Sequence, residues 1–574
     1  MSISNKEIKK NAEKWLDPFF DTETREKVED LIKNNPTKLA DSFYKRLAFG
    51  TGGMRGIMGP GDNRINKYTL GKNTQGLANY LKKQFPGETI KLAIAHDCRH
   101  NSKEFAKLVA DVATANDIQT YLFSDLRPTP ELSFSVKHLE CHAGIVLTAS
   151  HNPPEYNGYK VYWQDGGQLV PPQDAGVIEE INTLQYQDVN FHAKKELLTY
   201  IDKEVDEAYI NTVIKKVDFQ VAQEAKDNLK IVFTSLHGTS ITILPEVLKR
   251  AGYSQVQLVK EQETPDGDFP TVQSPNPEEP AALKMAIDLA NKTQADVVMG
   301  TDPDSDRIGI AVRDEDGKMV LLNGNQAMAI KTYFLLDQLK KKNKTKGNEF
   351  VASTIVSTPL IRKIADHFNV KYMEGLTGFK WIAKMVKDHP ELQFIGGGEE
   401  SFGYMVGDFV RDKDAISAAL LIAEIGATQK AKNSNLLAYL NEIHLELGFY
   451  KEHLISLVKK GLKGAKEIKQ TMEDWRSNPF SEIAGEKVIR VEDYAVQEAT
   501  NLLTNKKEKL TIPASNVLIY YTDQGSKIAA RPSGTEPKIK FYVSVNVPKD
   551  TKSPEKLLNQ KIDAIVQFLD VDKA

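Results

Sequence analysis

The sequence predicts three consecutive α/β domains followed by a smaller α+β domain. Between residues 92 and 395, short apolar runs alternate with segments of helical length and pattern in three rounds of similar size. The C-terminal part differs, because its apolar runs at 517–521, 527–530 and 539–545 alternate like strands of an antiparallel sheet. A chain of 574 residues is also too long for a single hydrophobic core.

Composition places the chain among ordinary globular proteins, with 41% hydrophobic and 27% charged residues. A net charge of −3 gives no general attraction to nucleic acid, so an anionic ligand would need a local basic pocket. No apolar stretch reaches the length of a membrane span, and the Lys/Glu-rich N-terminus is unlike a signal peptide. Only Cys98 and Cys141 occur, which excludes a disulfide framework and a cysteine-based zinc site. We therefore expect a cytoplasmic protein without nucleic-acid or membrane partners.

The N-terminal region is expected to be helical from about residue 6 to residue 45, without chemistry of its own. It leads into residues 49–56, which are rich in glycine around the single arginine Arg55. Such a stretch suits an anion-binding loop, and a flexible turn is the alternative. It matches neither the P-loop nor the dinucleotide fingerprint.

The first α/β round ends at a serine. Its predicted elements are a strand at 92–95, a helix at 102–115, a strand at 119–123 and a buried strand at 143–147. The last strand leads into a loop that presents Ser150 and His151 at the lip of a sheet. Ser150 is a candidate nucleophile, although a Ser/Asn turn closed by Pro153 explains the loop equally simply. Lys160 could enter the same cleft or be a solvated surface lysine.

The second and third rounds continue the alternation. Their predicted elements are strands at 230–233, 296–299, 350–356, 370–373 and 393–395, and helices at 244–251, 281–289 and 359–368.

An acidic loop directly after the strand at 296–299 is the most specific local signal. Asp302, Asp304 and Asp306 can turn toward one point, where a hard divalent cation would relieve their repulsion. An EF-hand is excluded, because Arg307 stands at the position of its glycine and Arg313 at that of its bidentate glutamate. The pattern predicts a Mg²⁺ site with open positions, and an Asp-rich solvated turn is the alternative.

These features together predict phosphoryl transfer. A candidate nucleophilic serine, a metal loop and a Ser/Gly/Thr loop led by Arg531 supply the groups that such chemistry needs. Phosphate-monoester reactions are so slow that a metal, fixed cations and exclusion of water must share the barrier reduction. The available cations are Lys160, Lys380, Arg55, Arg307 and Arg531.

Four motifs resemble those of the α-D-phosphohexomutase (phosphoglucomutase/phosphomannomutase) family. They are TASHNP at 148–153, DPDSD at 302–306, GEESFG at 398–403 and RPSGTEP at 531–537. They occur in the family's order, and the resemblance covers essentially the whole chain. It implies three related α/β domains with mixed sheets and a C-terminal α+β domain around a central cleft. The boundaries we expect are 1–208, 209–322, 323–448 and 449–574.

The resemblance also implies residue roles. Ser150 would carry a phosphoryl group, and one Mg²⁺ per subunit would be held by that group with Asp302, Asp304 and Asp306. Lys160 and Lys380 are the candidates for acid/base assistance and Arg55 lies near the phosphoserine, while His151 is either a proton carrier or structural. Substrate binding is expected from Thr377, Gly378, Glu399, Ser401, Arg307, Arg531, Ser533, Gly534, Thr535 and Lys538. Many bacterial members have a histidine after the sugar-binding motif where this chain has Phe402-Gly403-Tyr404, which favours the lysines.

The expected substrates are sugar phosphates, and the long N-terminus and the GEESFG form favour glucose. We therefore expect phosphoglucomutase activity, an isomerase reaction through a glucose 1,6-bisphosphate intermediate, in a monomer or small homo-oligomer. Phosphopentomutase and phosphomannomutase are the alternatives within the family. A metal-dependent sugar phosphatase and a non-enzymatic sugar-phosphate sensor are alternatives from other classes, although a sensor needs no nucleophile.

Overall fold

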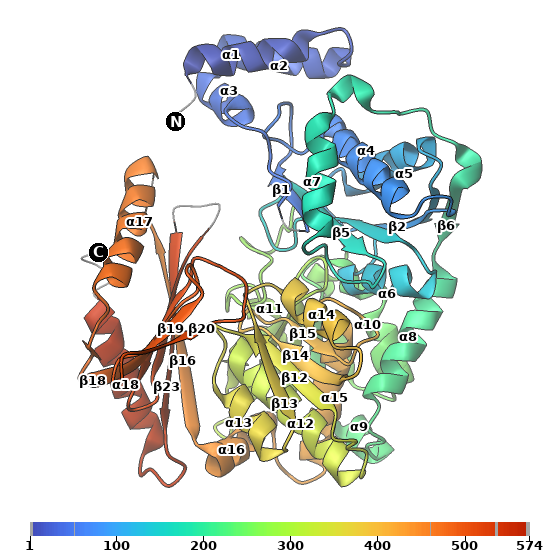
Figure 1. Cartoon of the computed structure of the whole chain (residues 1–574). Helices are drawn as coiled ribbons and strands as arrows, with labels where there is room; N and C mark the ends of the chain where they lie inside the picture. The colour runs from blue at the N-terminus through green and yellow to red at the C-terminus, as the bar shows by residue number, and fades with distance from the viewer. Residues whose placement is uncertain (1–3, 51, 460, 534–537, 570–574) are drawn as a thin grey trace. The chain divides into compact units, whose positions relative to one another are not determined.

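The computed structural model describes residues 4–50, 52–459, 461–533 and 538–569 (Figure 1). The chain forms two compact units. Unit 1 comprises Met1–Leu322, Ala383–His389 and Phe402–Lys432, and unit 2 comprises Asn323–Ile382, Pro390–Ser401 and Asn433–Ala574. Among the described helices, none combines the length and apolar character that crossing a membrane requires.

The predicted helical layer begins unit 1. It consists of α1 (Asn5–Glu13), η1 (Lys14–Leu16), α2 (Thr22–Asn34) and α3 (Pro36–Phe43). Side chains of Ser4, Asp21 and Asn35 accept backbone N–H groups at the three helix starts, which fixes where each helix begins. Between the helices, the buried Trp15 stacks on Phe20. The layer is therefore a small apolar cluster of its own.

The first α/β domain is built on a six-stranded sheet in the order β1-β5-β4-β2-β3-β6. Its strands are β1 (Gly53–Ile57), β2 (Lys91–His96), β3 (Gln119–Phe123), β4 (Ala143–Leu147), β5 (Tyr156–Trp163) and β6 (Leu198–Ile201). Four of them, β4-β2-β3-β6, are parallel, whereas β1 and β5 are antiparallel to their neighbours. The helices are α4 (Lys67–Gln84), α5 (Ser102–Ala115), α6 (Thr129–His138) and α7 (Gln173–Thr183), with short turns η2 (Tyr186–Asp188) and η3 (Lys195–Leu197).

This sheet corrects one expectation. The glycine-rich stretch is not wholly a loop, because its second half is strand β1, paired with β5. Gly53 is required there: it has φ +145°, and a Cβ atom at this position would lie 2.1 Å from the Tyr159 carbonyl oxygen. The predicted strands β2, β3 and β4 and the helix α5 are confirmed.

The second α/β domain has a five-stranded sheet in the order β11-β10-β9-β7-β8. Its strands are β7 (Ile231–Thr234), β8 (Val256–Leu258), β9 (Val297–Thr301), β10 (Ile308–Arg313) and β11 (Met319–Leu322). The associated helices and turns are α8 (Lys203–Val217), α9 (Gln223–Asn228), η4 (Thr239–Thr242), α10 (Leu244–Arg250), η5 (Lys260–Gln262), α11 (Lys284–Thr293) and α15 (Ala415–Lys430). Strand β15 (Tyr404–Val406) also belongs to unit 1.

Unit 2 contains a third α/β arrangement and the C-terminal sheet. Strand β12 (Glu349–Thr354) is parallel to β13 (Lys371–Gly375) and to β14 (Gln393–Gly398). The helices of this region are α12 (Gly324–Lys341), α13 (Leu360–His367) and α16 (Leu436–Leu447), whereas α14 (Phe379–Asp388) begins in unit 2 and continues into the part of unit 1 that starts at Ala383.

The C-terminal sheet is antiparallel throughout, in the order β16-β23-β22-β21-β18-β19-β20, with β17 paired to β18. Its strands are β16 (Phe449–Val458), β17 (Glu482–Ile483), β18 (Glu486–Asp493), β19 (Glu498–Asn501), β20 (Lys506–Lys509), β21 (Leu518–Thr522), β22 (Lys527–Pro532) and β23 (Lys538–Val547), and its helices are α17 (Gly461–Ser477) and α18 (Pro554–Leu569). The predicted fold class, three α/β domains and a C-terminal α+β domain, is confirmed. The exact domain boundaries remain predictions.

Candidate functional site

Ser150 lies in the loop that follows β4, and its backbone is unusual. Its φ of +52° is in the left-handed region, which costs a residue with a side chain on the order of 1–3 kcal/mol. The Ser150 N–H donates to Thr148 Oγ1 at 2.9 Å, which helps to hold this conformation. Ser150 Oγ in turn donates to Asp302 Oδ2 at 2.6 Å. The structure thus brings the candidate nucleophile directly to the acidic loop.

The Arg99 side chain holds the serine loop in place through hydrogen bonds to its backbone. Its side chain is fully buried and donates to the carbonyl oxygens of Ser150 (2.6 Å), Pro153 (2.8 Å) and Tyr156 (3.1 Å), and to that of Asn152. The guanidinium also faces Asp97, with Nε 3.4 Å from Oδ2. One buried charge therefore fixes the path of the loop at several points.

The acidic loop follows β9, as predicted. Asp302, Asp304 and Asp306 are buried, and each contributes a carboxylate oxygen to a group whose members all lie within 4.8 Å of one another. Asp302 Oδ1 accepts the N–H groups of Asp306 and Arg307 at 3.1 and 3.0 Å, so the backbone orients this carboxylate. Asp304 Oδ1 and Asp306 Oδ1 are buried and accept no hydrogen bond from the residues that the structure describes. Buried carboxylate oxygens without donors suit a divalent cation.

The loop backbone is braced from the second α/β domain. Thr239 donates its N–H to the Pro303 carbonyl at 2.8 Å, and its hydroxyl lies 2.7 Å from that of Ser305. Gly238 permits this approach, because a Cβ atom there would lie 2.5 Å from Pro303 Cα. The loop is held before any ligand arrives.

Two of the three carboxylates, Asp302 and Asp306, have pKa values shifted in opposite directions. Burial, with repulsion from Asp304 and Asp306, raises the pKa of Asp302 well above its ordinary value. Burial also acts to raise the pKa of Asp306, but the charges of Lys413, Lys160 and Arg307 outweigh it and the pKa is lowered. The neighbouring cations therefore offset the negative charge of Asp306. The repulsion that raises the pKa of Asp302 would be relieved by a further positive charge.

Lys160 and Lys413 lie directly on the acidic cluster. Lys160 Nζ is 3.3 Å from Asp304 Oδ2 and 3.2 Å from Asp306 Oδ2, and Lys413 Nζ is 3.1 Å from Asp306 Oδ2. Burial acts to lower the pKa of Lys160, but the adjacent aspartates outweigh it and the pKa is raised. Lys160 is therefore a charged group in this arrangement, in contrast to the lowered pKa that a lysine base at neutral pH requires.

His151 also points to the nucleophile. Its Nδ1 lies 3.1 Å from Ser150 Oγ and 4.0 Å from Asp302 Oδ2. Burial and the charges of Arg307 and Arg55 lower the pKa of His151 to about 2, so the ring is neutral at physiological pH. The Ser150 hydroxyl already donates its hydrogen to Asp302. In the tautomer that is protonated at Nδ1, the His151 ring would donate a hydrogen bond to the Ser150 oxygen. Both roles considered for His151, proton carrier and structural, remain predictions.

The two arginines of this region take different positions. Arg55, on β1, donates to Asn152 Oδ1 at 2.8 Å and so contacts the serine loop. Arg307 forms an ion pair with Glu278, and its Nε lies 3.7 Å from Asp306 Oδ1. Unit 1 thus gathers Ser150, His151, Lys160, Arg55, Arg307 and the three aspartates.

Unit 2 contains the expected sugar-binding residues. The N–H of Gly378, which has φ +114°, donates to Glu399 Oε1 at 2.7 Å. Thr377, the residue before Gly378, has a buried hydroxyl, and Lys380 lies on α14 with its ammonium 5.4 Å from the Trp381 ring centroid. Ser401 is half-buried after β14. Glu399 is therefore fixed by the loop that precedes Lys380.

The expected phosphate-binding loop connects β22 and β23. Arg531 Nη1 lies 3.5 Å from the Tyr542 hydroxyl, and the Ser533 N–H donates to the Lys538 carbonyl at 2.7 Å. Gly534 and Thr535 lie outside the described residues. The described part forms the base of a β-hairpin that carries two cations.

Sequence reasoning missed three residues of the unit 1 site. Arg99 holds the serine loop, Lys413 contacts Asp306, and Thr129 Oγ1 donates to Asp304 Oδ2 at 3.0 Å. Thr129 lies in the Arg-Pro-Thr-Pro stretch that follows β3. Its position after the end of a predicted strand could have identified it as a site residue, because ligands bind at the carboxyl ends of such strands. Lys413 had no local signal, because it follows the serine by more than 260 positions.

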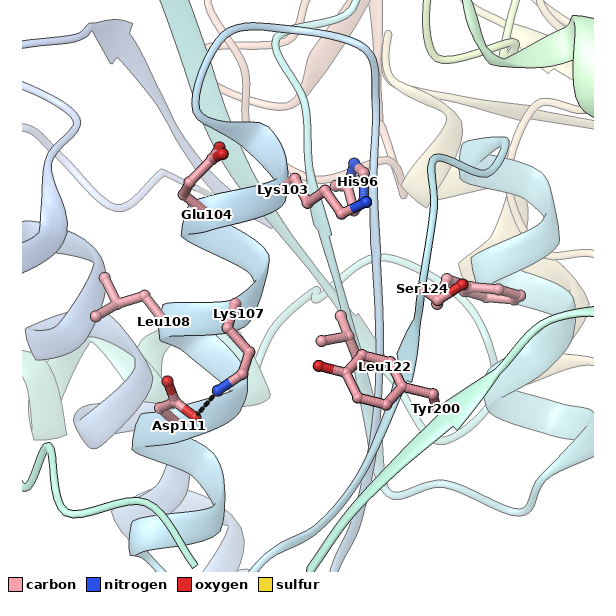
Figure 2. A pocket seen from close by; sticks show the side chains of 10 residues that line it. His96, Lys103, Glu104, Lys107, Leu108, Asp111, Leu122, Ser124 and Tyr200 are labelled. Atoms are coloured by element: carbon pink, nitrogen blue, oxygen red, sulfur yellow. Dashed lines mark hydrogen bonds and ion pairs between the residues drawn. The ribbon is translucent and has the colours of Figure 1, made fainter. Parts of the chain in front are cut away.

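A separate cavity of about 510 Å³ lies on the flank of the first α/β domain (Figure 2). It is bordered by α5, where Lys107 forms an ion pair with Asp111, and by strand residues including Leu122 and Tyr200. None of the predicted site residues lines it. The candidate site is accordingly the serine and aspartate loops, not this cavity.

Comparison with known proteins agrees with this geometry. Models of the phosphoglucomutase/phosphomannomutase α/β/α domains I, II and III match residues 46–188, 207–317 and 323–443. A phosphoglucomutase of Staphylococcus epidermidis is 38% identical, over 93% of this chain and 96% of its own length. One from Staphylococcus aureus is 41% identical, over 88% and 91%.

Solved structures share the fold. Parafusin, a phosphoglucomutase from Paramecium in an open form, superposes with a TM-score of 0.69 at 19% identity, over 92% of this chain and 95% of its own. A phosphoglucomutase/phosphomannomutase family protein from Burkholderia thailandensis gives 0.64 at 18% identity, over 91% and 97%.

Proposed function

Because the chain belongs to the phosphoglucomutase/phosphomannomutase family, we propose that it interconverts α-D-glucose 1-phosphate and glucose 6-phosphate. It is an isomerase, an intramolecular phosphotransferase that acts on sugar phosphates. The glucose assignment is supported by the relatives, since the two Staphylococcus proteins described as phosphoglucomutases match nearly the full chain at 38% and 41% identity.

One observation carries the mechanism: Ser150 Oγ lies 2.6 Å from a carboxylate of the buried three-aspartate cluster. A serine hydroxyl alone is a weak nucleophile and a poor leaving group. Placed against a cation site, its oxygen can both receive and release a phosphoryl group, because charge on the transferring oxygens is neutralised there. A sensor of sugar phosphates would need neither group.

The proposed reaction has two transfers. In the first, the bond between phosphorus and Ser150 Oγ breaks and one to the sugar O6 forms, while the O6 proton leaves; the product is glucose 1,6-bisphosphate. After the intermediate turns over, the bond between phosphorus and O1 breaks, the phosphoryl group returns to Ser150 Oγ, and O1 gains a proton. The enzyme thus ends as it began, phosphorylated on Ser150.

We assign a separate role in phosphoryl transfer to each group of charged side chains. The carboxylates of Asp302, Asp304 and Asp306 would hold Mg²⁺, which supplies Lewis-acid stabilisation of the transferring phosphoryl oxygens when it is bound. Lys160, charged in this arrangement, suits an acid or an electrostatic role. Lys380 is the proposed base, and Arg55 and Arg307 would contribute positive charge around the phosphoserine.

Substrate recognition is proposed for the loops of unit 2. Glu399 would accept hydrogen bonds from sugar hydroxyls, and Ser401 would donate to or accept from them. Thr377 and Gly378 would shape the loop that orients Glu399. The non-reacting phosphate would be held by Arg531, Ser533, Gly534, Thr535 and Lys538. We also propose that the enzyme is cytoplasmic and that it is a monomer or a small homo-oligomer.

Turnover of competing sugars tests the assignment. We expect kcat/KM for glucose 1-phosphate, with Mg²⁺ and catalytic glucose 1,6-bisphosphate, to exceed that for mannose 1-phosphate and ribose 1-phosphate by at least tenfold. Ser150→Ala is the control for a contaminating mutase. A preference for ribose 1-phosphate would reassign the enzyme as a phosphopentomutase, and release of inorganic phosphate equal to substrate loss would make it a phosphatase.

A further inference from the structure

A second, smaller cavity in unit 1 lies apart from the serine and aspartate loops. It has a volume of about 250 Å³ and is bordered by α4, by α7 and by the segment that precedes β1. The residues that matter below are Arg46, Lys72, Asp62 and Tyr186, all of which line it. None of these residues belongs to the proposed catalytic machinery.

Lys72 is a buried cation in this cavity. It lies within α4 and is only 8% exposed, yet its ammonium makes neither a hydrogen bond nor an ion pair with any residue that the structure describes. Burial and the positive charge of Arg46 lower the pKa of Lys72, and the carboxylates of Asp62 and Asp188 offset only part of this effect. No described carboxylate lies within ion-pair distance of this ammonium, so the cavity contains a cation without an anion in direct contact.

Nearby carboxylates do not supply that anion. Asp62 accepts hydrogen bonds from the Tyr186 hydroxyl at 2.6 Å and from Trp15 Nε1 at 3.3 Å, and it is not within ion-pair distance of Lys72. Asp188 accepts the Gln185 N–H at 2.6 Å as part of a turn. Lys72 Nζ lies over the ring of Tyr186, 5.7 Å from the ring centroid.

Arg46 provides the second cation of the cavity. Its side chain is exposed and likewise makes no ion pair with a described residue, so it is available at the rim. Asn73 and Thr69 add polar groups from α4, and Asn182 from α7. A lysine ammonium, a rim guanidinium and side-chain amides are groups that can bind a tetrahedral oxyanion.

We propose that this cavity binds a small polyvalent anion, namely inorganic phosphate, between Lys72 and Arg46. A volume of about 250 Å³ is below the roughly 300–1,000 Å³ of pockets that hold drug-sized ligands, which favours an ion over a sugar phosphate. The site is distinct from the phosphates handled in catalysis. Its anion would also restrain residues 46–49, the segment that leads toward β1 and Arg55.

Equilibrium dialysis with radiolabelled inorganic phosphate tests the proposal on the full chain. The wild type, Lys72→Gln and Lys82→Gln are compared, because Lys82 is an exposed lysine of the same helix outside the cavity. We expect Lys72→Gln to lose one equivalent of bound phosphate per chain, with a Kd on the order of 1 mM or tighter in the wild type. Lys82→Gln should bind like the wild type.

Equal stoichiometry in the wild type and Lys72→Gln would overturn the proposal, as would a Lys72-dependent equivalent that appears only far above millimolar phosphate. Arg46→Gln is the second variant, because its exposed side chain can be removed without disturbing the core. It should weaken the same equivalent at least tenfold. If Lys72→Gln does not fold, unchanged binding by Arg46→Gln overturns the proposal by itself.

Discussion

Replacing Arg99 tests whether the serine loop is held by one buried guanidinium. In Arg99→Met the carbonyl oxygens of Ser150, Pro153 and Tyr156 lose their donor, and Asp97 loses the charge 3.4 Å away. Removing one partner of a buried ion pair costs about 3–5 kcal/mol, because the other charge stays buried. Ser150 would also lose the contact that helps to hold its left-handed conformation.

Catalysis should suffer more than stability alone explains. A displacement of about 1 Å at a reacting group can cost on the order of 100-fold in rate, so kcat/KM of folded Arg99→Met should fall at least that far. Urea unfolding and steady-state turnover of glucose 1-phosphate measure the two effects separately.

Arg127→Met is the matched control. Arg127 is also buried in the first α/β domain and forms an ion pair with Asp206 at 2.8 Å, but its side chain makes no described contact with the serine loop. We expect a comparable loss of stability and a change in kcat/KM of only a few-fold. Wild-type kcat/KM in folded Arg99→Met, or an equal loss in Arg127→Met, would refute the role of Arg99.

Three further outcomes are expected. Asp304→Asn should weaken Mg²⁺ activation at least tenfold with little change in volume; isothermal titration with Mg²⁺ measures this, and unchanged affinity would remove Asp304 from the metal site. Arg531→Ala should raise KM with a small effect on kcat, because a non-reacting phosphate is bound equally in the ground and transition states, and a pure kcat loss would contradict that role. Burial lowers the pKa of His444 to about 4, so its contribution to stability is complete above about pH 6.5 and is lost as the pH falls toward 4. His444→Gln should reduce the slope of unfolding free energy against pH in that window by up to about 1.4 kcal/mol per pH unit, and an unchanged slope in urea titrations would contradict this assignment.

The sequence was informative wherever local pattern determines structure. Helix α5 begins and ends at the predicted residues, and β4 and β9 deliver Ser150 and Asp302 to loops at strand ends, as apolar runs followed by turn residues predict. Helix α11 was predicted to begin at Ala281 but begins at Lys284, because the preceding residues form hydrogen-bonded turns after Pro280.

Contacts between segments that are distant in the sequence could not be predicted from local sequence patterns. Strand β1 exists only because β5 pairs with it, so its glycine-rich sequence looked like a loop. Lys413 contacts Asp306 from more than 100 residues away. The pKa of Lys160 depends on the same assembly, because the aspartates that raise it lie more than 140 positions away in the sequence.

Phosphorylation of Ser150 is the most direct test of the mechanism. Intact-mass and peptide mass spectrometry would be applied to the purified protein after incubation with glucose 1,6-bisphosphate and Mg²⁺, and again after glucose 1-phosphate is added. The account predicts one added phosphoryl group per chain, on Ser150, which is absent from Ser150→Ala and exchanges with substrate. An active enzyme that never acquires phosphate at Ser150 would contradict it.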